Sequence, residues 1–190
     1  QHSIYPKFRK AFLSSVKKIV VGNPKNKNSF LGALVSELHM KKVLSYIDLA
    51  KKDGGKILFG GKRVLLKGNL KNGYYISPTV IEGLDHRSVI NQEEIFGPVV
   101  SLIPFKEEKD VVKMANSTKY GLSASVFTEN LSKAHRVSSK INSGLIWVNS
   151  WLIRDLRIPF GGMKQSGLGR EGGFDSLVFF TEAKNVCVKI

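Results

Sequence analysis

The chain has 190 residues, of which 42% are hydrophobic, so its length suits one domain or one and a half. Its formal charge of +15 comes mostly from lysines, some of them in pairs such as 17–18, 41–42 and 51–52 on helix faces. We interpret the charge as a solvated surface, because a nucleic-acid binder would cluster Arg and Lys with aromatic residues. No apolar run reaches the roughly 18 residues of a membrane span, and the single cysteine, Cys187, excludes an internal disulfide.

The first residues, Gln1 to Pro6, lack both an initiator Met and the pattern of a signal peptide. We therefore expect a processed or truncated chain. The single cysteine fits a reducing, cytoplasmic setting.

The first half of the sequence predicts two amphipathic helices followed by strands. The first helix ends at Gly22-Asn23-Pro24, and the second begins after Ser36, a plausible N-cap. Gly54-Gly55 breaks the second helix. Residues 56–59 then predict a short strand, and residues 74–84 an extended segment that Pro78 places at an edge or bend. The apolar stripes that define the two helices are Phe8, Ala11, Phe12, Val16, Ile19 and Val20, and Met40, Val43, Leu44, Ile47 and Ala50.

The second half alternates strands with helices of about ten residues, which indicates an α/β fold with a doubly wound parallel sheet. The expected strands are 99–105, 122–127 and 145–149, and the expected helices are 107–116 and 131–141. Residues 183–190 alternate polar and apolar side chains, which predicts a half-exposed strand that could join another sheet edge.

Residues 93–98, Glu-Glu-Ile-Phe-Gly-Pro, stand directly before a predicted strand. Such a turn can project one carboxylate and one ring: the carboxylate can accept hydrogen bonds from a ribose diol, and the ring can pack on a flat heterocycle. The alternative is an ordinary acidic turn with a core phenylalanine.

Residues 149–160 follow the carboxyl end of a predicted buried strand, where α/β sheets place ligands. Apolar and aromatic residues surround Arg154 and Arg157, which predicts a pocket that holds a cation able to pair with a carboxylate. The alternative is a surface loop in which one arginine pairs with Asp155.

The glycine-dense segment 160–171 is neither a phosphate loop nor a dinucleotide fingerprint, because it lacks the Lys-Ser/Thr of the first and the preceding strand of the second. Cys187 lies on the terminal segment with no histidine nearby in sequence, so we do not assign it as a nucleophile. The four histidines are scattered, and no metal-ligand spacing is present.

Seven segments, taken in order and spacing, resemble the C-terminal part of the aldehyde dehydrogenase superfamily. They are residues 21–24, 73–80, 93–98, 120–122, 144–149, 159–167 and 169–171. The resemblance implies an incomplete, doubly wound parallel-sheet catalytic domain over 1–172 that lacks its nucleophile segment. Residues 173–190 would form a helix and strand that serve as an oligomerisation arm. The NAD-binding domain would be absent.

The resemblance also implies site residues. Glu94 would hold the nicotinamide ribose of NAD and Phe96 would pack beside the cofactor, with His39 and Lys42 on a helix near the same ribose. Phe160 would form an aromatic wall of the aldehyde tunnel. In the family a cysteine thiolate attacks the aldehyde, hydride passes to NAD, and a glutamate-activated water releases the acid. These catalytic groups lie upstream of the matched region, so none is expected in this chain, which would be inactive alone.

Three segments resemble the 2-hydroxymuconic and 2-aminomuconic semialdehyde dehydrogenases of aromatic-compound catabolism: 151–157, 164–173 and 181–189. Their substrates carry a carboxylate away from the aldehyde, and Arg154 would bind it. Arg157 would assist or form a structural pair, with Trp151 and Leu152 beside them. The alternatives are a general or betaine-type aldehyde dehydrogenase, or a non-catalytic module that only assembles with other subunits. The expected partners are a small aldehyde and further copies of the chain, joined through 183–190 as a dimer or tetramer, with no nucleic acid, membrane or metal.

Overall fold

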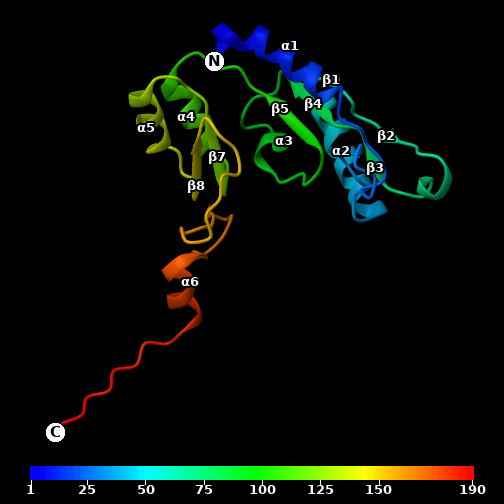
Figure 1. Cartoon of the computed structure of the whole chain (residues 1–190). Helices are drawn as coiled ribbons and strands as arrows, with labels where there is room; N and C mark the ends of the chain where they lie inside the picture. The colour runs from blue at the N-terminus through cyan, green and yellow to red at the C-terminus, as the bar shows by residue number, and fades with distance from the viewer. The chain divides into compact units, whose positions relative to one another are not determined.

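The computed structural model describes residues 1–190, which divide into two compact units, residues 1–110 and 111–190 (Figure 1). The elements of the first unit are η1 (His2–Ile4), α1 (Tyr5–Val16), α2 (Glu37–Lys52), β1 (Lys56–Phe59), β2 (Arg63–Val64), η2 (Gly68–Leu70), β3 (Tyr75–Ile76), β4 (Thr79–Glu82), α3 (Val89–Gln92) and β5 (Val99–Leu102). Helix α4 (Glu108–Asn116) crosses the boundary between the units.

The first unit is built on a three-stranded sheet in the order β1-β4-β5, in which β4 pairs with β5 in parallel and with β1 antiparallel. Strand β4 is covered on both faces, because Val80 packs with Val16 of α1 whereas its neighbour Ile81 packs with Ala50 of α2. Alternate residues of a strand point to opposite faces, so one buried strand holds both helices in place. Strands β2 and β3 form a separate antiparallel pair.

Helix α2 forms where the sequence predicts it. The Ser36 hydroxyl accepts a hydrogen bond from the backbone N–H of His39 at 3.1 Å, which satisfies one of the free donors at the start of the helix. Glu37 in the first turn and Lys51 and Lys52 in the last turn complement the helix dipole. Four of the five residues of the predicted apolar stripe are buried, with Val43 at 0% exposure, and Leu44 is partly buried.

The second unit contains β6 (Tyr120–Gly121), β7 (Ser123–Val126), α5 (Leu131–Ser138), β8 (Leu145–Val148), β9 (Met163–Lys164) and α6 (Gly173–Phe180). Strands β7 and β8 pair in parallel, and α5 connects them, with Ala134 and Val137 buried against them. The Asn130 side chain caps α5 by accepting from Lys133 N at 2.8 Å. Strand β6 pairs antiparallel with β9.

The parallel pairs β4–β5 and β7–β8, each covered by helices, confirm the predicted α/β class with parallel-sheet elements. No helix of the chain combines the length and the apolar character that crossing a bilayer requires. The predicted boundary between residues 172 and 173 falls where α6 begins, and its meaning as a domain boundary remains a prediction.

Several predicted elements differ from the structure in their bounds. Strand β5 ends at Leu102 and not at 105, and α5 ends at Ser138 and not at 141. The first helix was expected to include Ile19 and Val20, but α1 ends at Val16. The β-branched residues that follow favour an extended backbone, and Val20 O accepts hydrogen bonds from Phe30 N and Leu31 N.

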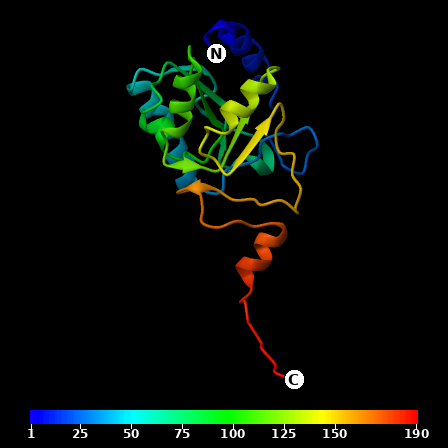
Figure 2. The same ribbon diagram turned by 90° about the vertical axis from the view of Figure 1, so that its left-hand side faces the viewer.

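The predicted strand at 183–190 is also absent. Those residues run as an exposed, extended segment beyond α6 without strand pairing (Figure 2). A strand needs a neighbouring edge for its backbone hydrogen bonds, and none is available to this segment within the chain.

Candidate functional site

The loop 93–98 is held by one face of α2. Lys42 Nζ donates to Glu94 O at 3.2 Å, and His39 Nε2 lies 2.7 Å from Phe96 O. Tyr46 donates its hydroxyl proton to the Glu93 carboxylate. Because a carbonyl oxygen only accepts, the His39 ring must carry its proton on Nε2 in this contact. Helical spacing places residues 39, 42 and 46 on neighbouring turns, so three side chains fix three points of one loop.

The two predicted cofactor groups of this loop point away from the core. Phe96 has a φ of +57° and is 76% exposed, and the exposed Glu94 carboxylate makes no hydrogen bond or ion pair. Gly97 lets the loop close on α2, because a Cβ there would lie 2.7 Å from Val43 Cγ2. Residues 31–34, Ile76 and 96–98 line an open hollow of about 510 Å³ beside it.

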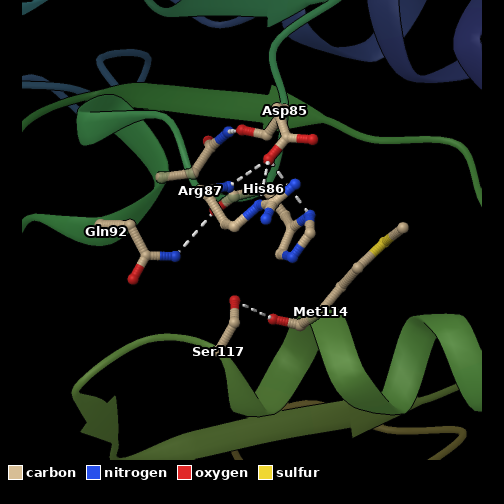
Figure 3. A network of polar contacts seen from close by, with 7 residues as sticks. Asp85, His86, Arg87, Gln92, Met114 and Ser117 are labelled. Atoms are coloured by element: carbon tan, nitrogen blue, oxygen red, sulfur yellow. Dashed lines mark hydrogen bonds and ion pairs between the residues drawn. The ribbon is translucent and has the colours of Figure 1, made fainter.

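A polar network in the turn before α3 sets the start of this loop. Asp85 Oδ1 accepts from Arg87 N at 2.8 Å and lies 3.4 Å from His86 Nδ1, and Gln92 Nε2 donates to His86 O at 2.7 Å (Figure 3). The Arg87 backbone hydrogen bond, followed by its side-chain bond and the charges of His86 and Arg87, lowers the pKa of the Asp85 carboxyl. These bonds join the turn 85–88 to the short helix α3 that follows it, so we assign them to local structure rather than to a reaction.

The loop after β8 is anchored to the strands that precede it. The Asn149 side chain closes on Thr128, donating from Nδ2 to its carbonyl at 2.9 Å and accepting from its N–H at Oδ1 at 2.8 Å. Trp147 Nε1 donates to Ile153 O at 2.8 Å, and Ser125 Oγ donates to Ser150 O at 3.1 Å. The residue before Arg154 is therefore tied to a buried strand residue.

Arg154 is held between an aromatic ring and a carboxylate. Its Cζ lies 3.8 Å from the centroid of the Phe160 ring, and its Nη2 donates to Glu171 Oε1 at 3.0 Å. Phe160 and Glu171 are themselves joined by two backbone hydrogen bonds, of 2.7 and 2.8 Å. The guanidinium thus has one face on the ring and one nitrogen on the acid.

Arg157 lies in a different environment. Its Nε donates to Asp155 Oδ1 at 2.9 Å and to Asp155 Oδ2 at 3.1 Å. This pairing lowers the pKa of the Asp155 carboxyl and raises the pKa of Arg157. The pairing that we considered as an alternative for this loop therefore describes Arg157 and not Arg154. The predicted neighbours Trp151 and Leu152 are 60% and 58% exposed, and Leu152 has a φ of +56°.

The glycine-dense segment bends around Arg170, whose Nη1 donates to Gly162 O at 2.9 Å and to Gly169 O at 2.6 Å. Phe160, Gly161 and Glu171 contribute to a hollow of about 360 Å³ that α6 completes with Phe179 and Phe180. Gly169 has a φ of +71°, and a Cβ on Gly162 would lie 2.5 Å from Ser166 Cβ, so these two glycines permit tight turns, as predicted. No group of three or more His, Cys, Asp or Glu side chains is arranged to hold a metal ion.

The sequence does not predict that Glu171 is the partner of Arg154, because the two are 17 residues apart and no motif in the glycine-rich loop indicates the pairing. It also missed Trp147 and Asn149 as anchors. An asparagine directly after a buried strand is a weak signal of such a clamp.

The sequence profile of the aldehyde dehydrogenase family matches residues 1–186, and the chain belongs to this family. Among curated relatives it is 45% identical to the 2-aminomuconic semialdehyde dehydrogenase of Danio rerio and 43% identical to the 2-hydroxymuconic semialdehyde dehydrogenase of Pseudomonas sp. (strain CF600). Each alignment covers 100% of this chain and 39% of the relative, so the chain spans about two-fifths of the length of these proteins.

Solved structures agree with the fold. The NAD⁺ complex of aldehyde dehydrogenase from Bacillus cereus has a TM-score of 0.92 and 37% identity, and the match covers 100% of this chain and 38% of that one. Betaine aldehyde dehydrogenase from Staphylococcus aureus in complex with NAD⁺ has a TM-score of 0.89 and 40% identity, over 95% of this chain and 36% of that one. The resemblance drawn from the seven segments is confirmed.

Proposed function

We propose that this chain is the C-terminal part of an NAD-dependent dehydrogenase that oxidises a semialdehyde with a carboxylate tail, of the 2-hydroxymuconic or 2-aminomuconic type, to the acid. The observation that carries the proposal is the guanidinium of Arg154, held in a loop at the carboxyl end of β8 with most of its N–H donors uncommitted. Several relatives named for muconic semialdehydes, at 41–46% identity over the whole chain, support the same substrate class.

The charge of Arg154 separates this proposal from the betaine-type alternative. A fixed guanidinium attracts a carboxylate and repels a trimethylammonium group. The 4-trimethylaminobutyraldehyde dehydrogenase A of Danio rerio is 40% identical to the chain, so overall identity separates the two substrate classes poorly. The sign of the charge at residue 154 is the sharper criterion.

The residues of the 93–98 loop fit the ribose and ring of NAD. Glu94 offers an unpaired, exposed carboxylate that can accept from a diol, and Phe96 offers an exposed ring. His39 and Lys42 contact the backbone of the loop, so we propose that they position Glu94 and Phe96, with the Lys42 ammonium also adding positive charge beside the loop. Bound NAD would supply the hydride acceptor. Every contribution of this chain would be binding and orientation.

The thiolate, the oxyanion site and the general base of the reaction would come from the part of the family fold that this chain does not match. We therefore propose that the chain alone reduces no NAD in the presence of an aldehyde. The exposed apolar row Phe174, Leu177, Val178, Phe179 and Phe180 of α6 supports assembly with further copies of the chain, with 183–190 pairing at a neighbouring sheet.

The test uses a complete dehydrogenase, obtained by fusing this chain to the part of the Danio rerio 2-aminomuconic semialdehyde dehydrogenase that it does not match. We expect the fusion to reduce NAD with a muconic semialdehyde. Arg154→Ala should raise KM for that substrate by about ten-fold or more, the effect of losing a hydrogen-bonded charge, and leave KM for benzaldehyde within about two-fold.

Arg157→Ala is the matched control, because this arginine of the same loop is already paired with Asp155. Its effect on KM should be small for both aldehydes. Equal effects of Arg154→Ala on the acid and the neutral aldehyde would contradict the carboxylate assignment. A fusion with a native-like circular dichroism spectrum and no activity on either aldehyde would contradict the dehydrogenase proposal itself.

A further inference from the structure

We propose that Glu171 and Phe160 are positioning residues, which hold the Arg154 guanidinium in one orientation so that its free edge can bind the substrate's carboxylate. This inference rests on the proposed function and deepens it. It assigns the selectivity for acid-tailed aldehydes to a group of three residues instead of one arginine.

The two holding residues form a single rigid unit. Phe160 N donates to Glu171 O at 2.7 Å, and Glu171 N donates to Phe160 O at 2.8 Å. Two residues paired in this antiparallel way have neighbouring side chains. The ring and the carboxylate that contact Arg154 therefore project from paired backbones, and the ten residues between them, 161–170, bend back where Arg170 bonds to Gly162 O and Gly169 O.

The opposite end of Arg154 is anchored as well. The indole of the buried Trp147 donates to Ile153 O, the carbonyl directly before Arg154. Trp147 belongs to β8, so the sheet anchors the backbone next to Arg154, and the paired residues Phe160 and Glu171 hold its guanidinium. A long, flexible side chain loses rotamer entropy when a ligand orders it. Because two contacts already order Arg154 in the free protein, that entropy loss on binding is smaller.

The geometry leaves the guanidinium available to a ligand. Glu171 takes one hydrogen bond, from Nη2, out of the five N–H donors that an arginine carries. Phe160 covers a face of the group and uses no donor. A carboxylate that binds through both oxygens needs two donors, and four of the five remain uncommitted.

Arg157 shows the contrasting arrangement in the same loop. Its Nε and Nη2 both donate to Asp155, which occupies a side-on edge of the guanidinium. An incoming carboxylate would have to displace that partner. The two arginines thus differ in how they are paired: Arg157 commits two nitrogens to one carboxylate, whereas Arg154 commits one nitrogen to Glu171 and keeps its other donors free.

The contrary hypothesis is that Glu171 competes with the substrate for Arg154. The two hypotheses predict opposite signs. If Glu171 positions Arg154, then Glu171→Ala in the fusion enzyme should raise KM for a muconic semialdehyde about five-fold, as expected for an exposed ion pair, with kcat unchanged. KM for benzaldehyde should stay within about two-fold, and Glu171→Gln, which can still accept from Nη2, should restore most of the loss.

Glu129→Ala is the control, because Glu129 is another exposed carboxylate of the same unit. A fall in KM on Glu171→Ala would show competition and overturn the inference. An unchanged KM on Glu171→Ala, alongside a selective effect of Arg154→Ala, would overturn the inference and leave the proposed function standing. If Arg154→Ala changes KM equally for the muconic semialdehyde and benzaldehyde, the proposed substrate class itself is contradicted.

A second measurement needs no activity and uses the chain of 190 residues itself. Protons above an aromatic ring resonate upfield, so the side-chain resonances of Arg154 should lie upfield of those of Arg157 in the proton NMR spectrum. Phe160→Leu should abolish the difference, and Glu171→Ala should reduce it while Glu171→Gln largely retains it. Arg154 resonances that do not respond to Glu171→Ala would overturn the inference.

Discussion

Gly144 lies where two backbone segments of the second unit meet. A Cβ built on Gly144 would lie 1.6 Å from Gly161 O and 3.3 Å from Gly162 Cα. Neither neighbour is a flexible side chain, so Gly144→Ala must separate the start of β8 from the segment that begins at Phe160. Overpacking usually costs about 1–3 kcal/mol, and an overlap with backbone belongs at the top of that range, so we expect about 3 kcal/mol or more.

Gly167→Ala is the matched control in the same unit. Its nearest neighbour to a new Cβ is Gly162 N at 3.6 Å, an ordinary contact, and its φ is not in the left-handed region. Its substitution should change stability by less than about 1 kcal/mol, since alanine also restricts the unfolded chain.

The assay follows tryptophan fluorescence through thermal and urea unfolding. The chain has two tryptophans, Trp147 and Trp151, and both belong to the second unit, so the signal reports that unit. We expect the midpoint of Gly144→Ala to fall by about 12 °C or more, at 4–8 °C for each kcal/mol in a unit of this size. A midpoint within about 2 °C of the unsubstituted chain, or an equal fall for Gly167→Ala, would refute the close approach.

Two further predictions concern the first unit. Burial and the hydrogen bond to Glu82 raise the pKa of Tyr5 to about 12. The neutral phenol therefore contributes stability that is fully present below the ordinary pKa of 10 and is lost as pH rises through 12. An ultraviolet titration should show one tyrosine that ionises late and that Tyr5→Phe removes, and a titration unchanged by that substitution would contradict the contact. Tyr46→Phe removes the hydroxyl that holds Glu93 and should weaken NAD binding by the fusion enzyme about five-fold in a fluorescence titration. The control is Lys41→Ala, on the same helix but paired with Glu37, which should leave NAD binding unchanged. Equal effects of the two substitutions would contradict the role of Tyr46 in supporting the loop.

The regular elements were predictable where local chemistry and periodicity agree. Ser36 caps α2 as expected, the stripe from Met40 to Ala50 is buried except for the partly buried Leu44, and the strand at 56–59 has its predicted bounds. Helix α1 is shorter than its apolar pattern, because Ile19 and Val20 continue the periodicity while the backbone beyond Lys18 pairs with residues 30–31. Periodicity records which side chains are buried, and a chain can bury them without remaining helical.

The candidate site was predictable in its residue types and not in its pairings. The sequence indicates a carboxylate and a ring at 93–98 and a cation at 154, since motif position alone suggests them. It does not indicate that Arg154 turns to Glu171 while Arg157 turns to Asp155, because both arginines have an acid within reach and tertiary bridging decides between them. The final residues show the same limit, because their alternation predicts a strand but they make no strand pairing within the chain.

Residues spaced along helix α2 hold different points of the 93–98 loop, so the order in which the helix unwinds sets the order in which these points are released. Helices fray from their ends, and the Ser36 cap lies one turn from His39, so loss of the cap frees the Phe96 carbonyl before Lys42 or Tyr46 lets go. The ring and the acid of this loop would therefore lose their supports at different temperatures. A modest change in the first turn of one helix can alter how the aromatic group is presented and leave the carboxylate in place.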